Sequence, residues 1–534
     1  MLHETPNLTG IGGLCELPRQ TISRSKRHTG SAVLLGVDIG TSSLKSKTYD
    51  IDGRLLGTGD QPLPIIQAEP TWAEQDPNLW WKALTRTIKI ALRQARVTSK
   101  DIAGVGIDCF SPSLIPIEKS GDALRNAITP LDVRSVEEVA EINEQLDASR
   151  IFEITGNRVA TSTSSLPSIL WIKKNEPRVF TRAHQFVHAN SYLGLRLTGA
   201  CKMDWSNAAL TALFATRKRH WSDEIADRFE IPLQKLPELC GPTEVVGETT
   251  SEAKKVGLRK GIPVAAGSID TNCAALGAGV VKEGQVIDSG GATSCIGVTT
   301  DEPHFDARFL NRCHALPGKW IIVSQGPHTG VALRWFRDEF CEEEKKRASR
   351  LGVDSFEVID KEAAKSPPGS NGVIFLPYFM GECSPIWNPF SAAVFFGLRL
   401  GNSKKDLIRS IMEGTAFNIR ENLAIIQNLG IKVRDIRSVG GQAKSRLWLK
   451  IRANVINQRI SVPKTRESAP LGSAILGGVA ADEFSDPAKV ASEISMVNEV
   501  IEPERSAHEK YQLIYSTYLA VYESLKPTFR VKLR

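Results

Sequence analysis

Two turns of small residues, each set between two extended runs, carry the groups of this sequence that are best suited to bind phosphate. The first runs from Gly40 to Lys45, directly after the apolar run that ends in Asp38. Glycine lets the backbone approach a ligand closely, and the amides and hydroxyls of a Gly-Thr-Ser-Ser turn can donate to phosphate oxygens. Lys45 adds a positive charge, and Asp38 can hold Mg²⁺ directly or through water. Taken alone, the stretch fits an ordinary hairpin with a buried acid at its mouth equally well.

The same order of features returns in the second half of the chain. Residues 284–289 are predicted to form a strand, Gly290 to Ser294 a turn of small residues, and residues 295–299 the returning strand. A second hairpin of this kind predicts two copies of one fold that close on a nucleotide between them. We expect the boundary between the copies at residues 279–284.

A third candidate group is the carboxylate of Asp270. It follows the apolar run 264–266 and a short turn of small residues, and it opens an expected helix. The helix dipole keeps a carboxylate at this position ionised, and the acid would face a cleft. A helix N-cap is the purely structural alternative, and the two roles can coexist.

The elements that position these groups alternate between strand and helix. An amphipathic helix is predicted at 79–92 behind the N-cap Asp76, and a strand at 103–108 leads into the polar loop 108–113. Such alternation indicates mostly parallel sheets with helices on both faces. Open α/β sheets bind ligands at the carboxyl ends of their strands, where this loop lies.

Glycines also follow a later strand, which is predicted at 436–439. The sequence Gly440-Gly441-Gln442 comes directly after it. The two glycines would let an adenine or a ribose lie against the backbone, and a plain strand-to-helix turn is the alternative.

The composition limits the classes of protein to which the chain can belong. With 534 residues, 41% of them hydrophobic and 24% charged, the chain is expected to form at least two globular domains. A net charge of +7 with dispersed basic residues does not indicate a nucleic-acid partner.

Nine cysteines without a C-x-x-C pair indicate reduced thiols in a cytoplasmic protein, and no apolar run is long enough to cross a membrane. Residues 1–31 are expected to be a disordered or spurious extension.

Several longer motifs together resemble the FGGY carbohydrate kinases, within the larger group that includes actin and the heat-shock chaperone ATPases. The resemblance runs from about Val33 to about Leu525. Residues 393–398 and 406–414 are similar to the family's C-terminal signature, and residues 440–445 to its adenosine motif. The segment from Ala266 to Asp270 resembles the one that bears the family's catalytic aspartate.

The resemblance implies a fold and its division along the chain. The expected class is α/β, with two ribonuclease H-like, actin-type ATPase domains and a nucleotide cleft between them. Residues 32–280 would form the N-terminal domain, on the sugar and phosphate side. Residues 284–528 would form the C-terminal domain, on the adenosine side.

The resemblance also implies a role for each group that matches a family motif. Asp270 resembles the general base that takes the proton from the sugar hydroxyl, and Asp38 resembles the acid that organises Mg²⁺. ATP and Mg²⁺ are therefore the expected cofactors. The residues expected to contact ATP are Gly40, Thr41, Ser42 and Lys45 in the first phosphate loop, Thr293 in the second, and Gly440, Gly441 and Gln442 at the nucleotide site.

The acceptor side departs from the family's patterns. Residues 109–112 replace the Met-His-Gly of xylulose kinases, residues 381–385 read Gly-Glu-Cys-Ser-Pro in place of Gly-Glu-Arg-Thr-Pro, and the Arg-Glu pair of glycerol kinases is absent. Asp132 and Arg134 keep the family's D-x-R, for which a structural ion pair is the alternative. The candidate acceptor contacts are Asp108, Ser111, Asp132, Thr163 and Thr271.

These motifs predict an ATP-dependent kinase that transfers the γ-phosphate of ATP to a sugar hydroxyl, with a ketopentose such as D-xylulose as the first acceptor to consider. The alternatives are a kinase for another ketose or polyol of the ribulose, glycerol or erythritol type, and a non-catalytic nucleotide-gated sugar sensor on the same fold. Asp270 favours the enzyme, because a sensor needs no base. The expected partners are a small sugar and ATP, without nucleic acid or membrane, and a homodimer is left open.

Overall fold

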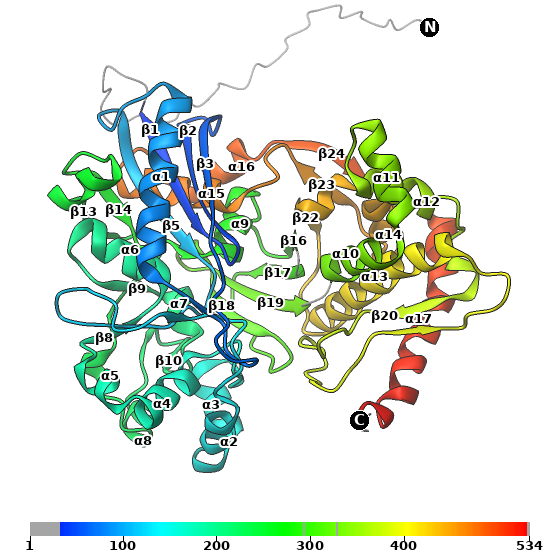
Figure 1. The fold of residues 1–534 in the computed structure, drawn as a ribbon, viewed down its shortest axis with the longest axis horizontal. Helices are drawn as coiled ribbons and strands as arrows, with labels where there is room; N and C mark the ends of the chain where they lie inside the picture. Colours follow the sequence, from blue (N-terminus) through cyan, green and yellow to red (C-terminus); the bar gives the residue numbers. More distant parts are fainter. Residues whose placement is uncertain (1–31, 292–293, 327–328, 531–534) are drawn as a thin grey trace, which may run out of the picture.

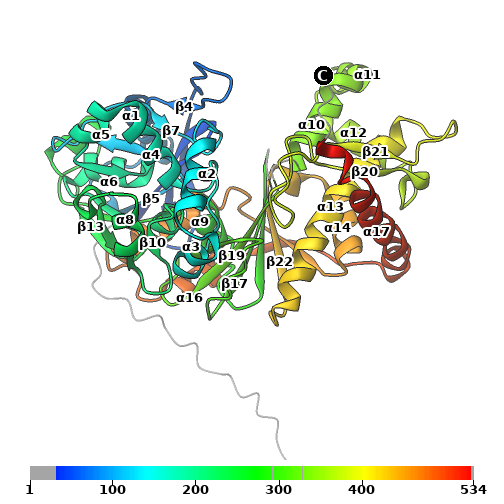
Figure 2. The same cartoon turned by 90° about the horizontal axis from the view of Figure 1, so that it is seen from below.

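The computed structural model describes residues 32–291, 294–326 and 329–530, which form two lobes, each built around one seven-stranded sheet (Figure 1). Seen from below, the lobes stand apart at one end and meet at the other (Figure 2). Residues 1–31, which the sequence predicts to be an extension, lie outside the described residues. None of the described helices is long and apolar enough to cross a bilayer.

The opening run folds into three antiparallel strands, of which the first two form the predicted hairpin. They are β1 (Val33–Ile39), β2 (Ser43–Asp50) and β3 (Leu55–Pro62). The next strand of the sheet, β5 (Ile102–Cys109), lies parallel to β1 on its other side. The sheet is completed by β14 (Pro263–Ala265), β13 (Val245–Glu248) and β15 (Ser268–Ile269).

The second sheet has the same order of strands, which confirms the predicted repeat of one fold. The antiparallel run consists of β16 (Gln285–Gly290), β17 (Ser294–Thr300) and β19 (Trp320–Gly326), and β22 (Asp435–Gly440) lies parallel to β16. The outer strands are β18 (Leu310–Cys313) at one edge, and β23 (Ile460–Pro463) and β24 (Val497–Ile501) at the other.

The two faces of the first sheet are covered by different helices, because successive side chains of a strand point to opposite sides. Leu35 and Val37 of β1 pack in the core that contains α1 (Pro77–Ala95), the amphipathic helix that the sequence predicts. Leu34 and Gly36 point to the other face, where they meet α15 (Ala469–Ala480).

Two helices cross between the lobes. The first, α9 (Asp270–Gly277), packs in one core with Ile287 and Val439 of the second sheet. The second, α15, comes from the C-terminal part of the chain and covers β1 and β5 of the first sheet. A Cβ on Gly472 of α15 would lie 1.9 Å from the carbonyl oxygen of Cys273 in α9, so glycine is what permits this close approach. The span 284–528, expected as the second domain, thus supplies one covering layer of the first lobe.

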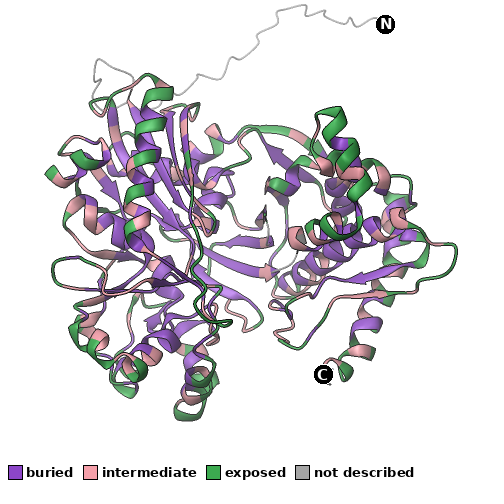
Figure 3. Cartoon of the chain, in the orientation of Figure 1, coloured by how far each residue is buried: buried purple, intermediate pink, exposed green. Residues whose placement is uncertain are grey.

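The remaining elements flank the sheets, and both sheets are largely buried between their helices (Figure 3). The first lobe adds β4 (Glu74–Gln75), β6 (Ile115–Ile117), β7 (Ala127–Ile128), α2 (Val136–Gln145), α3 (Ala148–Thr155), α4 (Ser165–Asn175), α5 (Pro177–Arg182), β8 (Gln185–Val187), α6 (Ala189–Thr198), β9 (Lys202–Asp204), α7 (Trp205–Ala209), β10 (Phe214–Ala215), β11 (His220–Trp221), α8 (Asp223–Arg228) and β12 (Glu238–Cys240). The second lobe adds α10 (Thr329–Phe340), α11 (Glu342–Leu351), α12 (Ser355–Ala363), β20 (Ile374–Leu376), β21 (Val394–Phe396), α13 (Lys404–Asn428), α14 (Arg446–Ile456) and α17 (Arg505–Leu525), and α16 (Pro487–Ile494) follows α15.

Candidate active site

A cavity of about 500 Å³ opens between the lobes, at the carboxyl ends of the central strands of both sheets. It brings together groups that the sequence places more than two hundred positions apart. The residues that line it from the first lobe are Asp38, Gly40, Lys45, Asp270, Thr271 and Ala274. The facing side is lined by residues 289–291, 439–441 and 466–470, with Cys295 and Lys444.

Asp38 and Asp108 are paired residues on the parallel strands β1 and β5. Burial raises the pKa of Asp38 to about 6, against the opposing charge of Lys45. Burial and the charge of Asp38 raise the pKa of Asp108 well above its usual value. One oxygen of Asp108 accepts from the hydroxyl of Ser473 on α15, and the other has no hydrogen-bond partner among the described residues. The structure thus places Asp108, expected at the acceptor, beside the expected Mg²⁺ residue.

Lys45 enters the cavity from β2 and is held there by an acid from the other side. Its Nζ lies 3.2 Å from Glu467 Oε1, and Lys47 pairs with the same carboxylate. Because Glu467 immediately precedes the crossing helix α15, these ion pairs connect the first phosphate turn to the segment that leads into that helix.

The turn before Lys45 closes the hairpin with its own backbone. The amide of Gly40 donates to the carbonyl of Ser43 at 2.9 Å, so this amide is not free to bind phosphate. Thr41 and Ser42 belong to the same turn but are not among the residues that line the cavity. Their expected contacts with ATP stay predictions.

Asp270 begins α9 and lines the cavity, where it is half-buried. One of its oxygens accepts from the backbone N–H of Thr271 at 2.5 Å and from the hydroxyl of Thr271 at 3.0 Å. Burial raises the pKa of Asp270, while the Thr271 hydrogen bonds and the charge of Arg312 lower it. The second oxygen is left to accept a proton from a bound hydroxyl. Thr271 therefore orients the acid, and its expected contact with the acceptor stays a prediction.

A second cavity, of about 480 Å³, adjoins the first and shares Gly291, Gly441, Lys444 and Arg466 with it. Apolar and aromatic walls with a few polar groups are the usual lining of a small-molecule site. In this cavity the apolar and aromatic residues include Leu333, Phe356 and Trp448. The polar residues include Arg334, Asp360 and Gln442. The predicted adenosine motif therefore lies beside the cavity between the lobes.

A buried network fixes the glycine turn between the two cavities. Gln442 Nε2 donates to Asp288 at 3.0 Å, and Arg452 pairs with Asp288 at 2.7 Å and also donates to Gln442. The side chain of Gln442 is thus occupied by protein partners, and its expected contact with the nucleotide stays a prediction. Gly440 has a φ of 84°, and a Cβ there would lie 2.3 Å from the carbonyl oxygen of Gly290, so this position requires glycine.

The second phosphate turn is described only in part. Thr293, the expected second phosphate contact, lies outside the described residues. On either side of it, Gly291 lines both cavities, and the hydroxyl of Ser294 donates to Asp288 at 3.4 Å.

The remaining acceptor candidates lie in separate places. The hydroxyl of Ser111 is 3.2 Å from Nδ1 of the buried His188, and burial lowers the pKa of this histidine to about 4, which keeps it neutral. Thr163 is buried, and its hydroxyl has no partner among the described residues. Asp132 does not line the cavity, and its carboxylate accepts from Arg134 at 2.9 and 2.7 Å. The ion pair that the sequence offered as the alternative for D-x-R is therefore present.

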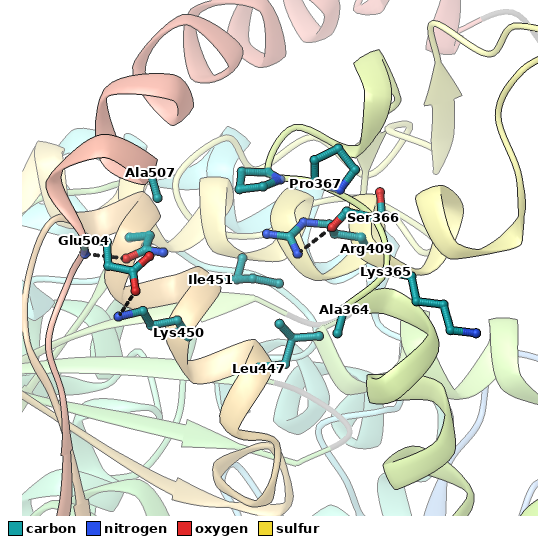
Figure 4. Close-up of a pocket in the computed structure, with 12 residues that line it drawn as sticks. Ala364, Lys365, Ser366, Pro367, Arg409, Leu447, Lys450, Ile451, Glu504 and Ala507 are labelled. Atoms are coloured by element: carbon teal, nitrogen blue, oxygen red, sulfur yellow. Dashed lines mark hydrogen bonds and ion pairs between the residues drawn. The ribbon is translucent and has the colours of Figure 1, made fainter.

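A third hollow, of about 400 Å³, lies in the second lobe between α13, α14 and α17 (Figure 4). Its charged groups are already paired. Arg409 binds the carboxylate of Glu413 at 2.8 Å, and Lys450 binds that of Glu504 at 3.0 Å. The cavity between the lobes is therefore the better candidate for the active site.

Sequence reasoning missed residues that reach the cavity from distant parts of the chain. Arg466 and Glu467 line it from the loop before α15, and Ser473 bonds to Asp108 from the helix itself. No local motif marks them. Their place follows from the crossing of α15 to the first lobe, which the local sequence pattern does not reveal.

Most of the chain matches known proteins. Residues 33–277 match the N-terminal domain of the FGGY family of carbohydrate kinases, and residues 288–481 match its C-terminal domain. A xylulose kinase of Staphylococcus epidermidis is 30% identical over 502 residues, which cover 92% of this chain and 97% of that protein. A gluconokinase of Bacillus subtilis is 29% identical over 454 residues, which cover 84% of this chain and 87% of that protein.

The fold agrees with the sequence matches. The crystal structure of a xylulose kinase from Rhodospirillum rubrum superimposes with a TM-score of 0.84 at 25% identity, and the match covers 93% of this chain and 100% of that one. The family domains, the relatives and the shared fold thus agree over nearly the whole chain. The chain belongs to the FGGY family of carbohydrate kinases, phosphotransferases with an alcohol group as acceptor.

Proposed function

We propose that the cavity between the lobes transfers the γ-phosphate of ATP to a hydroxyl of a small sugar, with Asp270 as the general base. The observation that carries this proposal is the convergence of Asp270, Asp38 and Lys45 on one cavity that continues into a second, partly apolar one, with Asp108 buried next to Asp38 on the neighbouring strand. Phosphoryl transfer depends on positioning and on neutralisation of charge, and this arrangement offers groups for both.

The acids at the first phosphate turn suit Mg²⁺. Asp38 and Asp108 are buried carboxylates with raised pKa values, and one oxygen of Asp108 has no partner among the described residues. No three described His, Cys, Asp or Glu side chains lie close enough together to hold a metal ion by themselves. Phosphate oxygens and water would complete the shell, as is usual for Mg²⁺. When bound, the ion supplies neutralisation of phosphate charge.

The chain's own residues then have separate tasks. Asp270 takes the proton of the acceptor hydroxyl on its free oxygen, while Thr271 holds the other oxygen in place. Lys45 offers its positive charge to the transferring group. The two lobes exclude water, which would otherwise compete as acceptor.

The acceptor is the open part of the proposal. The relatives differ in the sugars that their names give, xylulose for one and gluconate for the other. D-Xylulose, the acceptor that the sequence puts first, is the reference substrate for the assay. Another ketose or polyol, and a nucleotide-gated sensor without turnover, are the alternatives.

The test is a coupled assay of ADP release with Mg·ATP over a panel of ketopentoses, aldoses, polyols and sugar acids. The expected result is one acceptor well above the background without sugar. Tight ATP binding with no acceptor above that background would favour the sensor and refute the proposed transfer.

A further inference from the structure

One arginine near the proposed base is buried without a direct ion pair among the described residues. This arginine is Arg312 on β18, and the residue is only 3% exposed. Among the described residues, its Nε has no hydrogen-bond partner and no carboxylate forms an ion pair with it. Arginines are almost never fully buried unless they are paired, because removal of a charge from water is costly. A ligand that carries the opposite charge would remove this penalty.

The backbone on both sides of Arg312 is fixed against the first lobe. The carbonyl of Cys313 accepts from Asn272 Nδ2 at 2.8 Å. Asn272 lies in α9, two positions after Asp270. The N–H and the carbonyl of Asn311 bond to the side chain of Asn157, both at 2.8 Å. Because side chains alternate along a strand, Arg312 points away from the face that carries Asn311 and Cys313. The guanidinium is thus positioned by a rigid strand beside the start of α9.

The charged groups that act on Arg312 include the proposed base. Asp270 and Asp204 are the carboxylates that act on it, together with the thiol of Cys295. Arg312 does not line the cavity between the lobes. A contact with the acceptor is therefore favoured over a contact with the transferring phosphoryl group.

Asp204 cannot serve as the missing partner. Its carboxylate already accepts from the amides of Asn190 and Asn207 at 2.9 and 2.7 Å, and from the backbone and hydroxyl of Ser206. Asp270 has one oxygen bound by Thr271 and needs the other for the acceptor hydroxyl. Neither acid has an oxygen to spare for Arg312.

We propose that Arg312 binds a carboxylate of the acceptor, so that the preferred acceptor is a sugar acid of the aldonate class. The inference rests on the proposed function of the same cavity. The planar guanidinium fork matches the two oxygens of a carboxylate, and a neutral ketose or polyol offers nothing that balances its charge. Arg312 then sets the specificity of the site, while Asp270 performs the chemistry.

The test compares acceptors that share a carbon skeleton and differ in charge. D-Gluconate is paired with D-glucitol, and D-xylonate with xylitol and D-xylulose. Each is used in the ADP-release assay and, without ATP, in thermal unfolding of the enzyme. The variants are Arg312→Gln, the conservative Arg312→Lys, and the control Arg308→Gln. Arg308 is half-exposed and already paired with Asp306 at 2.6 Å.

The wild-type enzyme is expected to prefer an aldonate and to be stabilised by it. Arg312→Gln should lower kcat/KM for the aldonate by about a hundredfold or more, mainly through KM. For neutral sugars KM should stay unchanged, and any loss should appear only in kcat, since the charge of Arg312 also lowers the pKa of Asp270. Arg312→Lys should recover part of the loss, and Arg308→Gln should behave as wild type. Without acceptor, Arg312→Gln should unfold at the same or a higher temperature, since it removes an unbalanced buried charge.

Other outcomes separate the two proposals. A neutral sugar as the preferred acceptor, with no stabilisation by any aldonate, overturns the carboxylate site and leaves the kinase intact. Equal losses for charged and neutral acceptors in Arg312→Gln overturn it as well. Stabilisation by an aldonate that Arg312→Gln abolishes, without ADP release from any acceptor, supports the carboxylate site and refutes the proposed transfer.

Discussion

At the residue scale, Asp270 is the group on which the proposed chemistry depends, because one of its oxygens is bound by Thr271 and the other is free. Asp270→Asn keeps the shape and removes the base. We expect ATP binding to stay within about twofold of wild type and turnover to fall by about a hundredfold or more. Equilibrium binding of an ATP analogue and the ADP-release assay measure the two effects. Wild-type turnover in the variant would rule out Asp270 as the base.

Glu421 of α13 is a second residue whose surroundings make a prediction. Burial and the nearby charge of Glu523 raise its pKa from 4.5 to about 7, and its buried Oε2 has no hydrogen-bond partner among the described residues. Because the folded state holds this proton more tightly than the unfolded chain, this group makes stability fall as pH rises from about 4.5 to about 7.

Removal of this charge should therefore stabilise the protein above neutral pH. Glu421→Gln is expected to raise the free energy of unfolding at pH 8 by at most about 3 kcal/mol, and to have little effect at pH 4.5. Urea unfolding at both pH values tests this. The exposed Glu137→Gln is the control, and an equal gain at both pH values would contradict the assignment.

At the scale of elements, the contact of α15 with β1 and β5 depends on glycine. A Cβ on Gly106 of β5 would lie 1.8 Å from the carbonyl oxygen of Ser473, and the equivalent contact of Gly36 is as short. A methyl group at either place must push the helix away from the sheet, and with it the Ser473 hydroxyl that bonds to Asp108.

Gly106→Ala should therefore lower the free energy of unfolding by about 3 kcal/mol or more and also reduce turnover. The matched control is Gly194→Ala in α6, where an added Cβ meets no atom within 4 Å. Chemical denaturation and the ADP-release assay report the two effects. A Gly106→Ala variant as stable as the Gly194→Ala variant would show that the sheet and the helix are not packed this closely.

At the scale of the whole molecule, the lobes share a covering layer instead of folding as independent halves. α15 covers the first sheet although it lies in the C-terminal part of the chain, and α9 covers the second sheet although it precedes it. Motion of one lobe against the other would therefore act directly on Asp270, which begins α9, and on Asp108, which bonds to α15.

This arrangement predicts the behaviour of a fragment. Residues 32–280 alone, the span expected as the N-terminal domain, lack α15 and should not unfold cooperatively, because the α15 face of β1 and β5 is left uncovered. A matched fragment that carries residues 466–482 on a flexible linker should recover a cooperative transition. Near-ultraviolet circular dichroism during urea unfolding distinguishes them. A sharp transition in the short fragment would show that the lobe is independent.

The sequence by itself determined the features that depend on neighbouring residues. The hairpin before and after Gly40, the helix α1, the carboxylate at the start of α9 and the glycine turn at Gly440 all follow from alternation, turn chemistry and capping, which act over a few positions. The repeat of the hairpin was sufficient to predict two copies of one fold, and family motifs gave the reaction class.

Only the tertiary structure decided which distant groups meet. Ser473 and Asp108 are 365 positions apart, and Lys45 and Glu467 are 422 positions apart, yet both pairs bond, the second at the cavity and the first next to Asp38, which lines it. The same holds for Arg312, whose unbalanced charge is visible only once β18 is seen beside α9. The physical reason is that these contacts arise when whole faces of sheets and helices are buried against each other. Burial of this kind depends on the complete fold, while local periodicity records only which side of each element is apolar.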